Sequence, residues 1–126
     1  MDKQRFELGL NQRKATLGAD YVENNLKAAD DFNRPFQEAM TEWCWGFGWG
    51  DAAIDAKTRS LMNLTMIAAL GKMHEWELHL NGAITNGCSV EEIRAAIHAI
   101  AIYCGVPQGV ECFRIARKVL TEHNLL

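Results

Sequence analysis

Apolar residues recur at three- and four-residue steps along most of the chain, and no stretch alternates between polar and apolar residues over the length of a strand. The clearest example is residues 71–87, whose apolar stripe consists of Met73, Trp76, Leu80, Ala83 and Ile84. Gly71 marks the start of this predicted helix and Asn86-Gly87 marks its end, because glycine adopts the left-handed conformation without steric cost. The pattern predicts an all-α fold.

Capping residues and a proline in the N-terminal half predict further helices. Residues 2–16 carry few apolar side chains and suit a peripheral helix. Asp20 is expected to cap a short helix that runs through Leu26. Pro35 fits the first turn of the next helix, where a missing N–H is harmless. Asp55 is expected to cap a fourth helix.

The C-terminal half has equally clear boundaries. The sequence Ser89-Val-Glu-Glu92 is a capping box that begins a helix over residues 90–104. Gly105-Val-Pro107 separates this helix from a last one that ends near His123. We therefore predict about six to seven helices in a single domain over residues 1–126.

Residues 43–50, WCWGFGWG, stand apart from this pattern. Three glycines and four aromatic residues in eight positions argue against a regular helix. One interpretation is a packed corner between two helices. The other is the wall of a pocket, because pockets are lined mainly by apolar and aromatic groups, and it makes Trp45 a candidate for substrate contact.

Two helices, residues 61–70 and 90–104, are apolar on almost every side. A small domain has too few other helices to cover both, and exposed apolar faces of that size usually mark interfaces. We therefore predict an obligate homo-oligomer with these two helices near its centre. His98, in the middle of the second helix, is expected to be a core or interface histidine.

Composition narrows the class of protein. The chain has 126 residues, 48% of them hydrophobic, and a formal net charge of −3. It has no basic block typical of nucleic-acid binding, no apolar run of membrane-spanning length and no signal peptide, so we expect a cytoplasmic protein. Its four cysteines, Cys44, Cys88, Cys104 and Cys112, show neither a C-x-x-C nor a zinc spacing and are expected to be small buried apolar residues.

Candidate chemistry is concentrated in residues 71–87. Glu75 and His79 are one helical turn apart, which suits a proton-transfer pair, although such a pair can also be merely structural. Gly82 and Asn86 continue the same stripe. His74 is five residues from His79 and not four, so the zinc-protease spacing is not met and no metal site is predicted.

An ordered set of segments resembles the carboxymuconolactone decarboxylase family. The segments are Arg59-Ser60-Leu61, Ala69-Leu70-Gly71, Glu75, His79-Leu80, Gly82-Ala83, Asn86-Gly87, Glu91-Glu92-Ile93 and Tyr103-Cys-Gly-Val-Pro107, with Thr41-Glu-Trp-Cys-Trp-Gly46 upstream. The resemblance implies an alkylhydroperoxidase D-like helical fold assembled as a ring-like homo-oligomer, commonly a hexamer.

Two departures refine the resemblance. Thiol peroxidases of the same superfamily carry a C-x-x-C pair where this chain has Lys72 and Glu75, so disulfide chemistry has no nucleophile there. The decarboxylase branch remains. The best-known decarboxylases of the family carry a sequence that resembles W-G-E-x-W at this place. In this chain Phe47 occupies the position of that glutamate. A carboxylate is therefore missing from the expected pocket wall.

The resemblance implies a cofactor-free decarboxylase that acts on 4-carboxymuconolactone, or a related small lactone carboxylate, in aromatic catabolism such as the β-ketoadipate pathway. In such a substrate the electrons left by CO₂ run into the lactone carbonyl, which yields an enolate without any cofactor or metal. His79 would protonate the enolate carbon and Glu75 would orient His79. Arg59 would bind a carboxylate, or else form a surface salt bridge. Tyr103 would hydrogen-bond the lactone, or else only pack.

The residues by themselves are also compatible with two other classes of function. One is a thiol-dependent redox protein that uses its cysteines in an arrangement unlike that of the superfamily. The other is a non-catalytic oligomeric binding protein. Thiol alkylation separates the decarboxylase from the redox protein, because only the redox protein would lose its activity.

Overall fold

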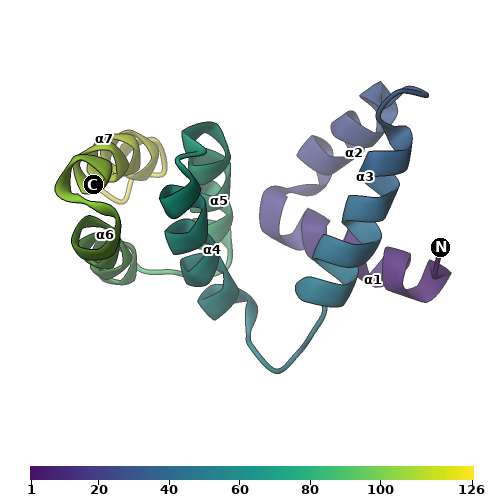
Figure 1. The fold of residues 1–126 in the computed structure, drawn as a ribbon, viewed down its shortest axis with the longest axis horizontal. Helices are drawn as coiled ribbons and strands as arrows, with labels where there is room; N and C mark the ends of the chain where they lie inside the picture. The colour runs from purple at the N-terminus through teal and green to yellow at the C-terminus, as the bar shows by residue number, and fades with distance from the viewer. The chain divides into compact units, whose positions relative to one another are not determined.

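The computed structural model describes all 126 residues, and it contains helices and no strand, which confirms the predicted all-α class (Figure 1). Its elements are α1 (Lys3–Leu17), α2 (Ala19–Ala28), α3 (Arg34–Met40), the π-helix η1 (Thr41–Gly48), α4 (Ala56–Leu70), α5 (Met73–Thr85), α6 (Val90–Cys104) and α7 (Val106–Glu122). None of the helices is both long enough and apolar enough to cross a membrane. The chain divides into two compact units, Met1–Ala56 and Lys57–Leu126. The single domain expected from the sequence stays a prediction.

The first unit is built around a close crossing of α1 and η1. A Cβ atom on Gly9 would lie 1.9 Å from the Thr41 carbonyl oxygen, and one on Gly46 would lie 2.3 Å from the Arg5 carbonyl oxygen. Both glycines are therefore needed so that the two helix backbones can touch. Beside this crossing, α2 begins at Ala19, and its N-cap is Gly18 and not the predicted Asp20, which lies within the first turn.

The aromatic stretch is helical, so the packed corner, one of the two interpretations of residues 43–50, is wrong. α3 begins with Pro35 in its first turn, as predicted, and runs directly into η1. The sequence argues against a regular helix here, whereas Thr41–Gly48 form a π-helix, whose turn is wider than that of an α-helix. Gly46 and Gly50 serve close packing and not a reversal: a Cβ on Gly50 would lie 2.1 Å from the Gly46 carbonyl oxygen.

The second unit packs α4 to α7 around Trp76. The Trp76 ring is fully buried, and its Nε1 donates a hydrogen bond of 2.9 Å to the Leu64 carbonyl oxygen. The buried core around it consists of Leu64, Ala68, Trp76, Leu80, Ala83, Cys88, Ile93, Ile97, Ile100, Cys112, Ile115, Ala116, Val119 and Leu120. All four helices contribute, so the unit has one continuous core.

The predicted ends of the C-terminal helices are confirmed. Gly71, Gly87 and Gly105 all have positive φ, between 70° and 105°, at helix boundaries. The capping box is complete: the Ser89 hydroxyl accepts a hydrogen bond from the Glu92 backbone, and the Glu92 carboxylate accepts one from the Ser89 backbone. These signals act within a few residues, which is why the sequence alone reveals them.

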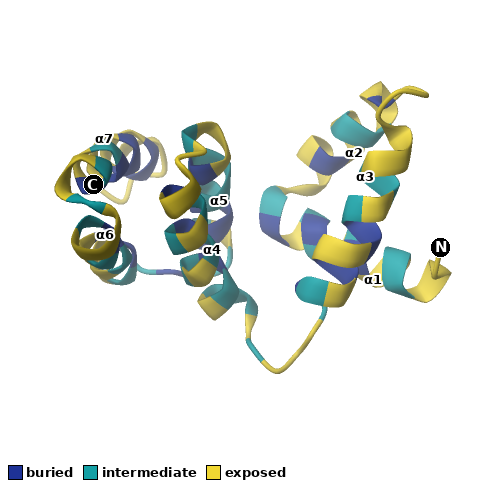
Figure 2. Cartoon of the chain, in the orientation of Figure 1, coloured by how far each residue is buried: buried dark blue, intermediate teal, exposed yellow.

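Residues 61–70, which are apolar on almost every side, are only partly covered within the chain. In α4 the side chains of Leu64 and Ala68 are buried, whereas Met62, Met66 and Leu70 are exposed. Exposed apolar side chains also occur at the junction of α6 and α7, where they include Ile102, Tyr103, Val106 and Val110 (Figure 2). One helix can turn only part of its circumference toward the core, so an all-round apolar sequence leaves apolar residues at the surface.

Candidate functional site

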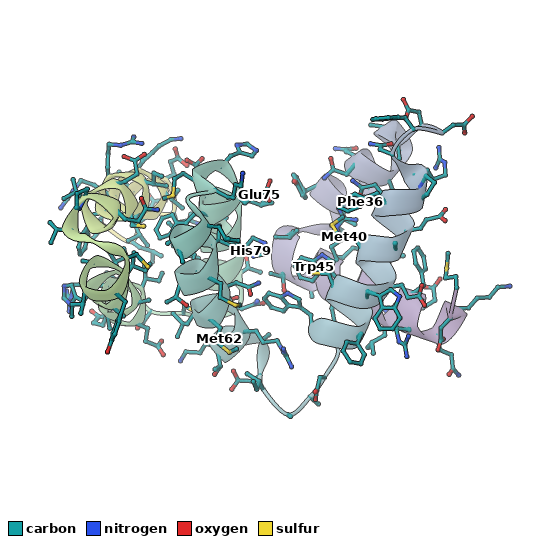
Figure 3. All side chains as sticks on the ribbon, viewed as in Figure 1. Phe36, Met40, Trp45, Met62, Glu75 and His79 are labelled. Carbon is teal, nitrogen blue, oxygen red and sulfur yellow. The ribbon has the colours of Figure 1, made fainter.

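The predicted proton-transfer pair lies on one side of α5. Glu75 and His79 project from the same side of the helix, one turn apart (Figure 3). Burial lowers the pKa of the His79 imidazole, and the negative charge of Glu75 acts in the opposite direction. The structure therefore provides a half-buried imidazole whose pKa depends on a neighbouring carboxylate. Such surroundings can tune the pKa of a general acid or base.

The same stripe of α5 is tied to the start of α4. The Asn86 side-chain amide donates a hydrogen bond of 3.0 Å to the Ser60 hydroxyl, and Ser60 is buried. Next to it, the Cys88 thiol lies 3.5 Å from the Lys57 carbonyl oxygen. Arg59, half-buried in the first turn of α4, directly precedes Ser60. The hydrogen bond thus holds the turn that carries Arg59 against the C-terminal end of the helix that carries His79.

In the first unit, Trp45 is buried and belongs to an apolar row. Its ring stacks on Trp49 with centroids 4.8 Å apart. Phe36, Met40 and Trp45 project from the same side of α3 and η1 (Figure 3). The steps between them are four and five residues, and the five-residue step matches the wider turn of a π-helix. An α-helical step of three or four residues from Met40 would continue the row at residue 43 or 44, so the spacing in the sequence does not connect Trp45 with Phe36 and Met40.

Phe47 does not belong to this row. The side chain of Phe47 is 63% exposed, and its ring centroid lies 5.4 Å from that of Trp43. The Arg5 guanidinium lies over both rings, 4.7 Å from the Trp43 centroid and 5.8 Å from the Phe47 centroid. Trp45, two residues earlier, is only 3% exposed. Residue 47 therefore lies on an exposed surface of the first unit, beside Arg5, and is not buried as Trp45 is. The loss of a carboxylate from a pocket wall at this position stays a prediction.

Tyr103 lies at the C-terminal end of α6 and is 89% exposed. Its neighbours in the sequence, Ile102 and Val106, are exposed as well. Packing inside the chain, the alternative reading of this tyrosine, is therefore wrong. A hydrogen bond from Tyr103 to a substrate stays a prediction.

The cysteines are free thiols, and only Cys88 and Cys112 are buried as predicted, whereas Cys44 and Cys104 are exposed. Burial raises the pKa of Cys112 to about 11, with the charge of Glu111 adding to the effect. Desolvation also raises the pKa of Cys44, although Arg13 opposes the shift. Both thiols are poor sources of thiolate near neutral pH, which is unfavourable for thiol redox chemistry. No group of three or more His, Cys, Asp or Glu side chains is arranged to hold a metal ion.

Comparison with known proteins shows that the chain is similar to proteins named as decarboxylases. The profile of the Carboxymuconolactone decarboxylase family matches residues 34–118. The chain is 40% identical over 122 residues to the nitrosuccinic acid decarboxylase npaB of Metarhizium robertsii, covering 97% of this chain and 85% of the relative. It is 31% identical over 121 residues to a 4-carboxymuconolactone decarboxylase of Acinetobacter baylyi, covering 96% of this chain and 90% of the relative. A 4-carboxymuconolactone decarboxylase of Pseudomonas putida is 40% identical over 45 residues, which are 36% of this chain and 94% of that relative.

Proposed function

The chain belongs to the carboxymuconolactone decarboxylase family, and from that membership we propose that it is a cofactor-independent decarboxylase of a small carboxylic acid with a built-in electron sink. The observation that carries the proposal is the similarity, over nearly the whole chain, to two relatives named as decarboxylases of different acids. The chemistry that these two acids have in common defines the substrate class.

Both acids can release CO₂ without a cofactor. In 4-carboxymuconolactone the bond between the ring carbon and the carboxylate breaks, and its electron pair runs through the ring alkene into the lactone carbonyl. In nitrosuccinic acid the electron pair from the carboxylate on the nitro-bearing carbon moves into the nitro group and forms a nitronate. In each case a proton then adds to carbon. Each acid also keeps a second carboxylate on a methylene arm.

Side chains of α4 and α5 are of the types that can bind a carboxylate and deliver a proton to carbon. His79 supplies the proton to carbon, because an imidazole titrates near neutral pH. Glu75 holds the imidazole and stabilises its protonated form. Arg59 binds a substrate carboxylate, since a guanidinium can donate two parallel hydrogen bonds to it. As in the prediction from the sequence, we propose that Trp45 and Tyr103 contact the substrate.

Two substrates of this class are candidates. The first is 4-carboxymuconolactone or a related lactone acid, which the family name and the Acinetobacter relative favour. The second is nitrosuccinic acid, favoured by the 40% identity to the Metarhizium relative. The experiment is to supply each acid to the purified protein and to measure CO₂ release and substrate loss. Turnover of either acid supports the proposal, and the ratio of kcat/KM values assigns the substrate. No CO₂ from either acid would overturn it.

We also propose that the enzyme is a homo-oligomer, with a hexamer as the first expectation. The exposed apolar residues of α4, and those at the junction of α6 and α7, support this assembly. Burying such residues against a second copy is favourable because it removes apolar area from water.

A further inference from the structure

A pocket between α6 and α7 lies apart from the residues assigned to decarboxylation. Its volume is about 160 Å³, and its floor consists of buried core side chains, among them Ile93, Ile97 and Leu120. None of Arg59, Glu75 and His79 lines it. A cavity of roughly 150 Å³ with apolar walls is large enough to hold benzene, so the pocket suits one aromatic ring or a branched alkyl group.

The rim of this pocket carries two arginines. Arg94 of α6 and Arg117 of α7 both line it, and no acidic side chain does; Leu126, with the main-chain carboxylate of the last residue, also lines it. Neither guanidinium takes part in an ion pair. The neighbouring cations of α7 differ, because Arg114 is paired with Glu111 at 2.6 Å and Lys118 is paired with Glu77 at 3.3 Å. Two unpaired guanidinium groups beside an apolar hollow are complementary to a ligand with an apolar body and one anionic end.

We propose that this pocket is a second ligand site, which binds a small aromatic monocarboxylate with its ring on the apolar floor and its carboxylate between Arg94 and Arg117. A carboxylate is preferred over a neutral group because a guanidinium forms charge-assisted hydrogen bonds with it. The floor belongs to the core that also holds Trp76 and Leu80 of α5, so the pocket is built on the packed core of the second unit. The site does not depend on the chain being a decarboxylase.

Calorimetric titration of the whole protein with sodium benzoate, at constant ionic strength, tests the proposal. We expect saturable binding, and binding of the neutral analogue benzamide at least tenfold weaker. The double variant R94Q/R117Q should lose at least tenfold in benzoate affinity, which corresponds to about 1.4 kcal/mol. Val90→Phe, which adds a ring to the pocket lining and leaves both arginines in place, should weaken benzoate binding as well.

Two control variants assign the binding to this pocket. Arg114→Gln removes a paired arginine from the same helix and should leave benzoate affinity unchanged. Arg59→Gln changes the arginine assigned to the substrate and should also retain benzoate binding. The R94Q/R117Q variant should turn over a decarboxylation substrate like the wild type. If the chain is no decarboxylase, the binding measurements remain decisive.

Three results would overturn the proposal. The first is the absence of saturable benzoate binding to the wild type. The second is an unchanged affinity in R94Q/R117Q. The third is a loss of binding in Arg59→Gln, which would assign benzoate to the decarboxylation site. Should benzoate fail to bind while R94Q/R117Q sediments as a smaller species than the wild type, the pocket is instead an interface between copies of the chain.

Discussion

His79 follows Glu75 by one turn of α5, and burial of the imidazole and the charge of the carboxylate act on the His79 pKa in opposite directions. The pair therefore combines an acid–base group with a neighbour whose charge partly offsets the effect of burial on its pKa. This relationship makes α5 the first place to test the proposed chemistry.

Removing the imidazole should affect turnover more than binding. His79→Ala should lower kcat by about 10²–10⁴, the usual contribution of a positioned general acid. KM should change much less, because the proton is delivered in the transition state. Steady-state kinetics on an accepted acid measures both constants. His98→Ala is the control, because His98 is exposed on α6, and its kcat should match the wild type. Near-normal turnover by a folded His79→Ala would refute the assignment.

The pH dependence should follow the protonated imidazole. Because burial lowers the His79 pKa below its ordinary value near 6.5, kcat/KM should fall as the pH rises through that lowered value. The charge of Glu75 raises this pKa, so Glu75→Gln should move the falling limb to lower pH. Profiles of kcat/KM between pH 4.5 and 9, an illustrative range of about four units around the imidazole pKa, measure the shift. A limb that stays in place in Glu75→Gln would argue that Glu75 does not act on His79.

The crossing of α1 and η1 should tolerate no side chain at Gly9. Gly9→Ala would put a Cβ 1.9 Å from the Thr41 carbonyl oxygen, so the helices must separate. We expect a loss of about 3 kcal/mol in the free energy of unfolding, at the upper end of overpacking effects. Gly48→Ala is the matched control, since its Cβ would meet nothing closer than 3.7 Å. Urea unfolding of the two variants should differ clearly, and equal stability would contradict the close crossing.

Assembly should be visible in solution. Sedimentation of the native protein should show a species several times the 14.2 kDa chain mass. Ile102→Glu places a charge on one of the most exposed apolar residues of α6 and should reduce the size of that species. Circular dichroism should stay unchanged, because Ile102 is not part of the core. A wild-type monomer at micromolar concentration would rule out the proposed homo-oligomer.

Thiol alkylation should leave decarboxylation intact. Iodoacetamide should modify the exposed Cys44 and Cys104 faster than the buried Cys88 and Cys112. Activity should persist because the proposed chemistry uses no thiolate, and mass spectrometry of the treated protein identifies the modified positions. Complete loss of activity on modification of Cys44 alone would favour the thiol-dependent alternative.

Local signals in the sequence determined much of the second unit. Gly71, Gly87 and the Ser89–Glu92 capping box act through hydrogen bonds and backbone conformations within a few residues, so the ends of α5 and α6 could be predicted. That Glu75 and His79 lie on the same side of α5 could also be predicted, because it follows from their four-residue spacing and the number of residues per turn. The family could also be predicted, because its short segments occur in order along the chain and the family profile matches residues 34–118.

Only the tertiary structure decided how residues 41–50 are used. No local rule distinguishes a glycine that ends a helix from one that allows two backbones to touch. Gly46 is of the second kind because α1, forty residues earlier in the sequence, crosses η1 at this point. Along η1, Trp45 is buried whereas Phe47, two residues later, is exposed beside Arg5 of α1. Burial depends on which helix covers a given face, and that information lies in contacts between distant parts of the chain.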